Sequence, residues 1–321
     1  MNPRVAIVAI GRNEGDRLKA CLASLPDVPI VYVDSGSTDG SVELARKSGA
    51  MVVELSPDRP FTAARARREG YEALCEQGCP DFIQFIDGDC ALQPGWLDQA
   101  LSAMEDHLDW GIVTGWRREV YPDASVYNAL CHHEWDRPAG DISTCGGDML
   151  VRAAAIKEAG PFDDHVIAAE DDEFCVRIRI AGWTIHRLPL EMTRHDAAMY
   201  HFEQWWKRAV RSGHGFAQVG QMHPPYFARE RQRVVVYGMV LPALAGLGLL
   251  FFWPLTILSL LVYGVNFLRI AQGLRGEGLE TARARRLAAL ITLSKIPNAI
   301  GMLEFYRRRL LGRRMHIIEY K

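Results

Sequence analysis

The sequence has few cysteines, and none of the seven stands in a Cys-x-x-Cys pair. This spacing excludes a zinc ribbon, and the odd number argues against a secreted disulfide framework, so we expect reduced thiols. No Gly-x-Gly-x-x-Gly follows the first apolar run, which disfavours dinucleotide redox chemistry. That run, residues 5–10, is too short for a signal peptide.

The sequence also lacks the composition of a disordered chain, with 49% hydrophobic and 24% charged residues. Its net charge of −2 conceals an asymmetry. Residues 229–321 carry 15 Lys and Arg against 5 Asp and Glu, whereas residues 1–228 carry 22 against 34. Because the basic part is also the most apolar, we expect it to bind membrane lipids and not nucleic acid.

The first 190 residues alternate short β-rich runs with amphipathic helical patterns. Strands are predicted at 4–10, 30–34, 51–55 and 82–86, and helices at 14–25, 40–47 and 62–77 and after Pro94. Such alternation predicts an α/β fold with a mostly parallel central sheet covered on both faces. Ligands of these sheets bind at the carboxyl ends of the strands.

Residues 234–268 form a run of 35 residues without charge, between Arg233 and Arg269. One membrane crossing needs about 20 apolar residues, so the run is long for one span and short for two. Pro254, beside Trp253, is the natural break of a hairpin, and arginines on both sides favour two cytoplasmic ends. A buried helical pair in a soluble protein is the alternative. The arginine-rich stretch 306–314 suits an interfacial helix.

Polar loops follow the predicted strands. The first strand runs into RNE at 12–14 and the second into DSGSTDGS at 34–41. A carboxylate at a strand end can accept hydrogen bonds from a base or a ribose, although these loops could equally be ordinary helix caps.

Two carboxylates follow the fourth strand, and a second acidic cluster opens a later helix. Asp87 and Asp89 could hold a divalent cation against a diphosphate. The acids at 170–173 could either complement the helix dipole or include a general base, and the residues alone do not separate these roles.

Taken in order, these blocks resemble family 2 glycosyltransferases, which have the nucleotide-sugar-binding GT-A fold. The resemblance spans about residues 3–215 and rests on RNE at 12–14, VDSGSTDGS at 33–41, AARARREG at 63–70, IDGD at 86–89, CGGDMLVR at 145–152, GPFDD at 160–164 and EDDEFCVRIRIAGW at 170–183.

The resemblance implies a role for several residues. Asp171 would be the catalytic base, and Asp89 would bind Mg²⁺ or Mn²⁺ at the diphosphate with Asp87. The remaining residues that it implicates are Glu14, Asp34 and Arg65 or Arg67 at the nucleotide, and Gly146, Gly147, Asp148 and Glu170 at the sugar and acceptor. His195 sits where some relatives contact metal or phosphate, and a core or surface histidine is equally consistent with its place.

The sequence therefore predicts a GT-A-like catalytic domain at 1–228, followed by a membrane hairpin and basic amphipathic tail at 229–321. The expected enzyme is an inverting hexosyltransferase of polysaccharide biosynthesis at the inner membrane, with its catalytic domain on the cytoplasmic side. It would move one sugar from a nucleotide-sugar donor to a lipid-linked or surface-glycan acceptor. The alternatives are a polyprenyl-phosphate sugar synthase and a non-catalytic nucleotide- or glycan-binding protein.

Overall fold

The predicted alternation of strands and helices is present in the computed structural model, which describes residues 4–313 and 315. The first elements are β1 (Val5–Gly11), α1 (Asp16–Ser24), β2 (Ile30–Asp34), α2 (Ser41–Lys47), β3 (Met51–Glu54), α3 (Ala63–Glu76) and β4 (Phe82–Asp87). They are followed by β5 (Cys90–Leu92), α4 (Trp96–Asp106), β6 (Trp110–Glu119), α5 (Val126–Trp135), β7 (Gly140–Asp141), β8 (Met149–Arg152), α6 (Ala153–Ala159), α7 (Glu170–Ile180) and β9 (Thr184–His195).

These strands form one sheet in the order β3-β2-β1-β4-β8-β6-β9-β5, with β7 paired to β9. The first four strands are parallel, which places the carboxyl ends of β1, β2 and β4 at one edge. This confirms the predicted α/β fold. The sequence did not indicate that β8 would join β4 antiparallel or that β5 and β7 would pair with β9.

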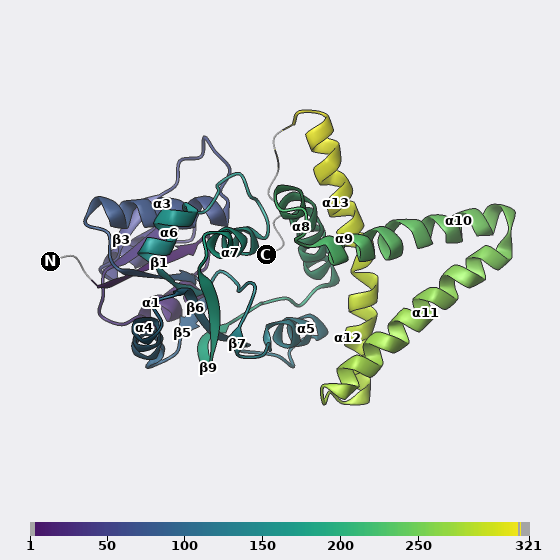
Figure 1. Ribbon diagram of the computed structural model, residues 1–321, viewed down its shortest axis with the longest axis horizontal. Helices are drawn as coiled ribbons and strands as arrows, with labels where there is room; N and C mark the ends of the chain where they lie inside the picture. The colour runs from purple at the N-terminus through teal and green to yellow at the C-terminus, as the bar shows by residue number, and fades with distance from the viewer. Residues whose placement is uncertain (1–3, 314, 316–321) are drawn as a thin grey trace. The chain divides into compact units, whose positions relative to one another are not determined.

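Helices cover both faces of the sheet (Figure 1). Both faces of strand β1 are apolar. Ala6, Val8 and Ile10 pack on the face covered by α3, α6 and α7. Val5, Ile7 and Ala9 pack on the face covered by α1, α2 and α4. A strand buried on both faces reads as a continuous apolar run. At the end of α3 the sulfur atoms of Cys75 and Cys79 lie next to each other, and the expectation of reduced thiols stays a prediction.

The backbone divides into two units, Met1–Tyr121 with Cys131–Ala197 and Pro122–Leu130 with Ala198–Lys321. The sheet lies in the first. The second contains α8 (Phe202–Met222), α9 (Ala228–Val235), the π-helix η1 (Val236–Val240), α10 (Leu241–Phe251), α11 (Trp253–Gly276), α12 (Thr281–Leu293) and α13 (Lys295–Leu310). The predicted domain boundary at residue 228 stays a prediction, which a truncated protein would test. Arg314, in the predicted basic tail, lies outside the described residues.

The helices α8 and α13 cross at very short range. A Cβ at Gly213 would overlap the carbonyl oxygen of Asn298, and a Cβ at Gly301 would overlap that of Val210. The buried amide of Asn298 donates to the carbonyl oxygen of Ala209 over 3.0 Å. Glycine at both positions is therefore required by the close approach of the two backbones.

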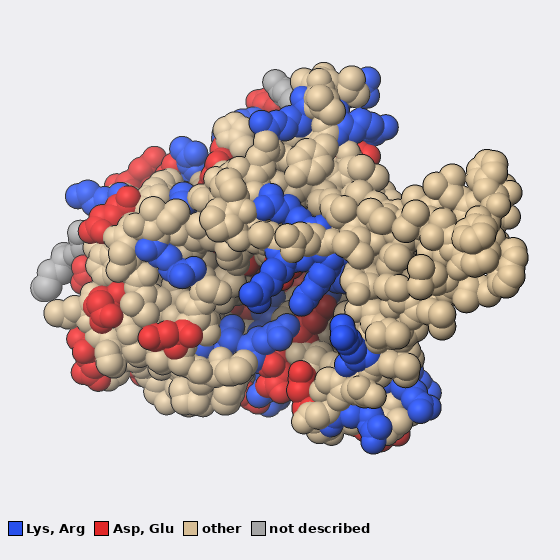
Figure 2. All heavy atoms as spheres, turned by 45° about the vertical axis from the view of Figure 1, so that its right-hand side comes forward, with Lys and Arg blue, Asp and Glu red and all other residues tan. Residues whose placement is uncertain are grey.

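Three stretches of helix in the second unit are long and apolar enough to cross a membrane: Ala228–Phe251, Trp253–Gly276 and Thr281–Leu310. The first two form the predicted hairpin, with α10 and α11 meeting at its end and diverging from there (Figure 1), and the break falls at Phe252 beside the expected Trp253 and Pro254. Figure 2 shows that the free end of this hairpin carries neither blue nor red side chains.

Candidate active site

The loops after β1 and β2 are tied to each other at the carboxyl edge of the sheet. The side-chain oxygen of Asn13 accepts a hydrogen bond from the Thr38 backbone N–H over 2.7 Å, and Asp39 accepts one from the Gly15 N–H over 2.9 Å. Glu14 forms an ion pair with Arg17 at 2.9 Å. These contacts fix the first loop beside Gly88, whose Cβ position would lie 3.5 Å from Cγ of Glu14.

Asp34 ends β2 as a buried carboxylate. Its Oδ2 accepts hydrogen bonds from the backbone N–H groups of Gly36 and Ser37 at 2.9 and 2.7 Å, and its Oδ1 accepts one from the Tyr32 hydroxyl at 3.2 Å. Burial, together with the charge of Asp34, raises the pKa of Tyr32, so the phenol stays a donor. Asp34 is thus held rigidly at the strand end where a nucleoside was predicted.

Asp87 ends β4 between two arginines. Arg67 of α3 donates to its Oδ1 over 2.6 Å, and Arg117 of β6 donates to its Oδ2 over 3.2 Å. Although burial opposes ionisation, Arg67 and Arg117 lower the pKa of Asp87. Both carboxylate oxygens are therefore occupied by guanidinium groups, and Asp87 is a poor metal ligand while these contacts hold.

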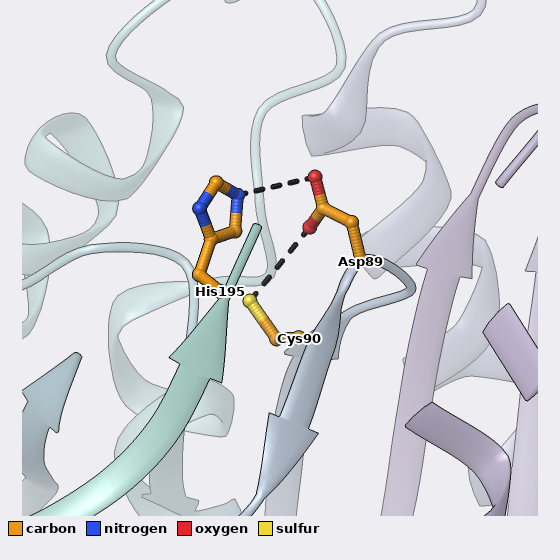
Figure 3. A group of neighbouring side chains, drawn as sticks. All are labelled: Asp89, Cys90 and His195. Carbon is orange, nitrogen blue, oxygen red and sulfur yellow. Dashed lines mark hydrogen bonds and ion pairs between the residues drawn. The ribbon is translucent and has the colours of Figure 1, made fainter. Parts of the chain in front are cut away.

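Asp89 and His195 form the best candidate metal centre among the described residues. His195 Nε2 lies 3.1 Å from Asp89 Oδ2, and the Cys90 thiol lies beside the same carboxylate (Figure 3). Burial raises the pKa of Cys90, so this thiol is protonated in the absence of a metal. The site therefore offers a carboxylate and an imidazole as candidate metal ligands.

Asp148 connects β8 to this edge of the sheet. Its Oδ1 accepts from the Asp87 backbone N–H at 2.9 Å, and its Oδ2 contacts Arg117 Nη2 at 2.8 Å and accepts from the Thr193 hydroxyl at 2.8 Å. The preceding glycines lie against the two arginines, since a Cβ at Gly147 would overlap the Arg67 guanidinium and one at Gly146 would lie 3.8 Å from Arg117 Nη2.

Asp171 lies in the first turn of α7 among other acids. Burial first, and then the charges of Asp172 and Glu170, raise its pKa to about 8, while Arg67 opposes the shift. The Cβ position of Gly146 is 3.9 Å from Asp171 Oδ2. The adjacent Glu170 accepts from Arg67 Nη1 over 2.8 Å, so one buried arginine links the start of α7 to Asp87. A carboxyl with a pKa near neutrality suits proton transfer.

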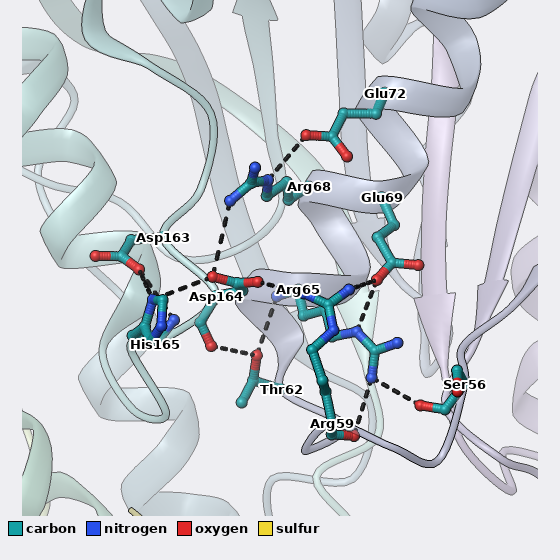
Figure 4. Close-up of polar contacts among 10 residues, drawn as sticks. All are labelled: Ser56, Arg59, Thr62, Arg65, Arg68, Glu69, Glu72, Asp163, Asp164 and His165. Carbon is teal, nitrogen blue, oxygen red and sulfur yellow. Dashed lines mark hydrogen bonds and ion pairs between the residues drawn. The ribbon is translucent and has the colours of Figure 1, made fainter.

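Arg65 lies in a separate polar cluster. Its Nε donates to Glu69 over 2.7 Å, and its Nη1 donates to the carbonyl oxygens of Ser56 and Arg59, both at 2.9 Å (Figure 4). Arg59 extends the cluster to Asp164 at 2.9 Å. Arg65 therefore holds the loop before α3, and its predicted contact with the nucleotide stays a prediction.

The structure brings the other predicted residues together and adds Arg117, which sequence reasoning missed. Arg67 was expected near the nucleotide but not as the partner of Asp87 and Glu170. Arg67 is 20 residues from Asp87 and 103 residues from Glu170 in the sequence. Arg117 is 30 residues from Asp87 and 31 residues from Asp148. Contacts over such separations leave no local pattern in the sequence. A weak signal existed, because two arginines interrupt the otherwise apolar strand β6.

Residues 6–144 match the model of glycosyl transferase family 2. Glycosyltransferase AglE of Haloferax volcanii is 24% identical over 68% of this chain and 74% of its own length. The pre-mycofactocin glycosyltransferase of Mycobacterium tuberculosis is 26% identical over 68% of this chain, which spans about half of that protein, 48%. Among solved structures, mannosyltransferase PcManGT from Pyrobaculum calidifontis is 18% identical, with a TM-score of 0.61 over 94% of this chain and 88% of that one.

The sheet order and the likeness to PcManGT show a GT-A fold. The family match over residues 6–144, together with the two related glycosyltransferases, supports a family 2 glycosyltransferase.

Proposed function

We propose that this glycosyltransferase transfers a single hexose from a nucleotide-sugar donor to a hydroxyl of a lipid-linked or surface-glycan acceptor, with inversion at the anomeric carbon. The observation that carries the proposal is Asp171, a half-buried carboxyl with a pKa of about 8 beside Gly146 and the Arg67–Glu170 ion pair. Inversion requires one base on the acceptor side, and Asp171 has the protonation behaviour of such a base.

Each polar group has a role in this mechanism. Asp171 takes the proton of the acceptor hydroxyl as the oxygen attacks the anomeric carbon. Asp34 and Glu14 hold the nucleoside at the ends of β2 and β1. Glu170 and Asp87 are held by Arg67, which keeps Asp171 in position.

A divalent cation would be held by Asp89 and His195 and would supply positive charge beside the departing diphosphate. PcManGT was solved with GDP-Man and Mn²⁺, which favours Mn²⁺ here as well. The oxygen and nitrogen donors of Asp89 and His195 are the candidate ligands of this ion.

The enzyme would work at the cytoplasmic side of the cell membrane, where nucleotide sugars are made. The apolar α10–α11 hairpin supports membrane association, and arginines at both of its ends favour their placement on the cytoplasmic face. A lipid-linked acceptor is consistent with this location.

The donor can be identified with a panel of UDP- and GDP-sugars, measuring release of the nucleoside diphosphate with Mn²⁺, Mg²⁺ and chelator. We expect turnover of at least one donor, dependent on the cation.

Asp89→Asn should weaken Mn²⁺-dependent nucleotide binding by about tenfold or more in calorimetry. The exposed Asp98→Asn on α4 is the matched control and should bind like the wild type. If the wild type bound the nucleoside diphosphate with equal affinity in Mn²⁺, in Mg²⁺ and in chelator, the metal assignment would be refuted.

A further inference from the structure

The end of the α10–α11 hairpin is apolar on every side. Its large side chains, in the segment 249–253, are all exposed, with Leu250 at 75% and Phe251 at 81% of their full surface. No charged residue occurs between Arg233 and Arg269, and the bare end of the hairpin is visible in Figure 2. An aqueous loop on the far side of a membrane would leave this surface in water, which the hydrophobic effect opposes.

The uncharged parts of the two arms are shorter than the 24-residue helices Ala228–Phe251 and Trp253–Gly276 that contain them. The apolar part of the first arm, 234–251, has 18 residues, and that of the second, 253–268, has 16. At about 1.5 Å per residue these reach about 27 and 24 Å, against a hydrocarbon core of about 30 Å. With Arg233 and Arg269 at one surface, arms of this length end about 3–6 Å short of the opposite edge, which favours an end inside the hydrocarbon, and any tilt reduces the depth further.

The break between the helices is compatible with this environment. Irregular backbone in lipid is costly because unpaired N–H and C=O groups find no water. Here the irregular backbone is confined to Phe252, whose N–H donates to the Gly248 carbonyl at 2.9 Å and whose carbonyl accepts from the Leu255 N–H at 3.0 Å. Pro254 has no N–H to satisfy.

Three hydroxyl groups of the second arm donate hydrogen bonds to backbone carbonyls. Thr256 donates across the pair to the Ala245 carbonyl at 2.9 Å, Ser259 donates to the Leu255 carbonyl at 2.9 Å, and Tyr263 donates to the Tyr237 carbonyl. Gly248 allows the close approach at Thr256, since a Cβ there would lie 2.5 Å from Thr256 N. Small residues and internal hydroxyl bonds are typical of helix pairs in lipid.

We propose that α10 and α11 form a re-entrant membrane hairpin that enters and leaves by the same face, with residues 249–253 inside the hydrocarbon core. The arginines at both ends, Arg233 on one arm and Arg269 and Arg275 on the other, contact anionic headgroups at that face. The inference rests on the membrane association proposed above and does not depend on the sugar that is transferred.

The test places single cysteines at two leucines of equal exposure, Leu250→Cys in the hairpin and Leu108→Cys in the first unit, both at 75%. A membrane-impermeant maleimide is applied to right-side-out and inside-out vesicles of cells that express the full chain. Leu108→Cys should react from one face only, which identifies that face. Leu250→Cys should react from neither face and become reactive in detergent. Reaction of Leu250→Cys from the opposite face would mean a full crossing, and reaction from the same face would mean no insertion; either overturns the proposal.

A second measurement distinguishes whether lipid or a second copy of the chain contacts the apolar end of the hairpin. A fluorophore on Leu250→Cys, in the full-length protein in phosphatidylcholine–phosphatidylglycerol vesicles, is quenched with nitroxide lipids. We expect stronger quenching by nitroxides deep in the acyl chain than by headgroup nitroxides. Protection from maleimide without quenching would assign the surface to a protein partner, and stronger quenching by headgroup nitroxides would place it at an interface; both overturn the proposal. If the Leu108→Cys protein stays in the supernatant when the vesicles are sedimented, the protein does not associate with the membrane. That result would overturn the membrane association without bearing on the sugar that is transferred.

Discussion

The proton affinity of Asp171 determines how turnover depends on pH. Burial and the neighbouring acids Asp172 and Glu170 raise its pKa to about 8, and a base must be deprotonated to act. We therefore expect kcat/KM to rise with pH up to an apparent pKa near 8. A pH–rate profile with a saturating cation measures this, and a flat profile between pH 6 and 9 would contradict the role of base.

The raised pKa of Asp171 also predicts a pH dependence of stability, opposite in direction to that of turnover. Because the pKa is about 8 in the folded protein and 3.8 in a free aspartate, the folded state binds the extra proton between these values. The free energy of unfolding contributed by Asp171 therefore falls as pH rises from about 4 to 8. In Asp171→Asn this part of the pH dependence should disappear from urea titrations, and an unchanged dependence would show that another group is responsible.

Arg67 should contribute more to stability than any exposed arginine of α3. It is buried and pairs with Asp87 at 2.6 Å and Glu170 at 2.8 Å, so Arg67→Met removes the guanidinium from Glu170 and leaves Asp87 with Arg117 alone of its two arginines. We expect a loss of about 3–5 kcal/mol in the free energy of unfolding. Arg68→Met, which removes a more exposed pair with Glu72 and a longer contact with Asp164 at 3.7 Å, is the control and should change it by about 1 kcal/mol or less. Equal stabilities of the two variants would contradict the bridging role.

At the scale of elements, the sequence predicted what local periodicity determines. The strands β1 to β4 and the helices between them follow from apolar runs of about six residues and 3.6-residue patterns, and the hairpin follows from a run without charge. The antiparallel β8 and β5, and the contacts of Arg117 with Asp87 and Asp148, depend on residues at least 30 positions apart. Pairing over such distances is set by the packing of the whole sheet and leaves no pattern in the sequence.

The crossing of α8 and α13 should tolerate no side chain at Gly301. A Cβ there would overlap the Val210 carbonyl, so Gly301→Ala must separate the helices and should cost about 1–3 kcal/mol. Gly273→Ala on α11 is the matched control, because nothing lies within 4 Å of that position. There alanine should stabilise the helix by about 0.5–1 kcal/mol. Thermal unfolding in detergent compares the two, and a neutral Gly301→Ala would refute the close packing.

At the scale of the whole molecule, the two ends of the hairpin should lie on one side of the membrane. The exposed positions Arg229→Cys and Gly276→Cys flank the uncharged run. We expect an impermeant maleimide to label both from the cytoplasmic side in inside-out vesicles and neither in intact cells. Labelling of one position from outside would establish a single crossing.

The central claim is that Asp171 is the base of sugar transfer, and the most direct test compares turnover with binding in Asp171→Asn. For the donor found in the panel, turnover should fall by about 10²–10⁴-fold. Calorimetric affinity for the nucleoside diphosphate with Mn²⁺ should stay close to that of the wild type. Turnover that survives in a variant with unchanged nucleotide binding would contradict the account. It would favour an acceptor that is already ionised, such as a polyprenyl phosphate.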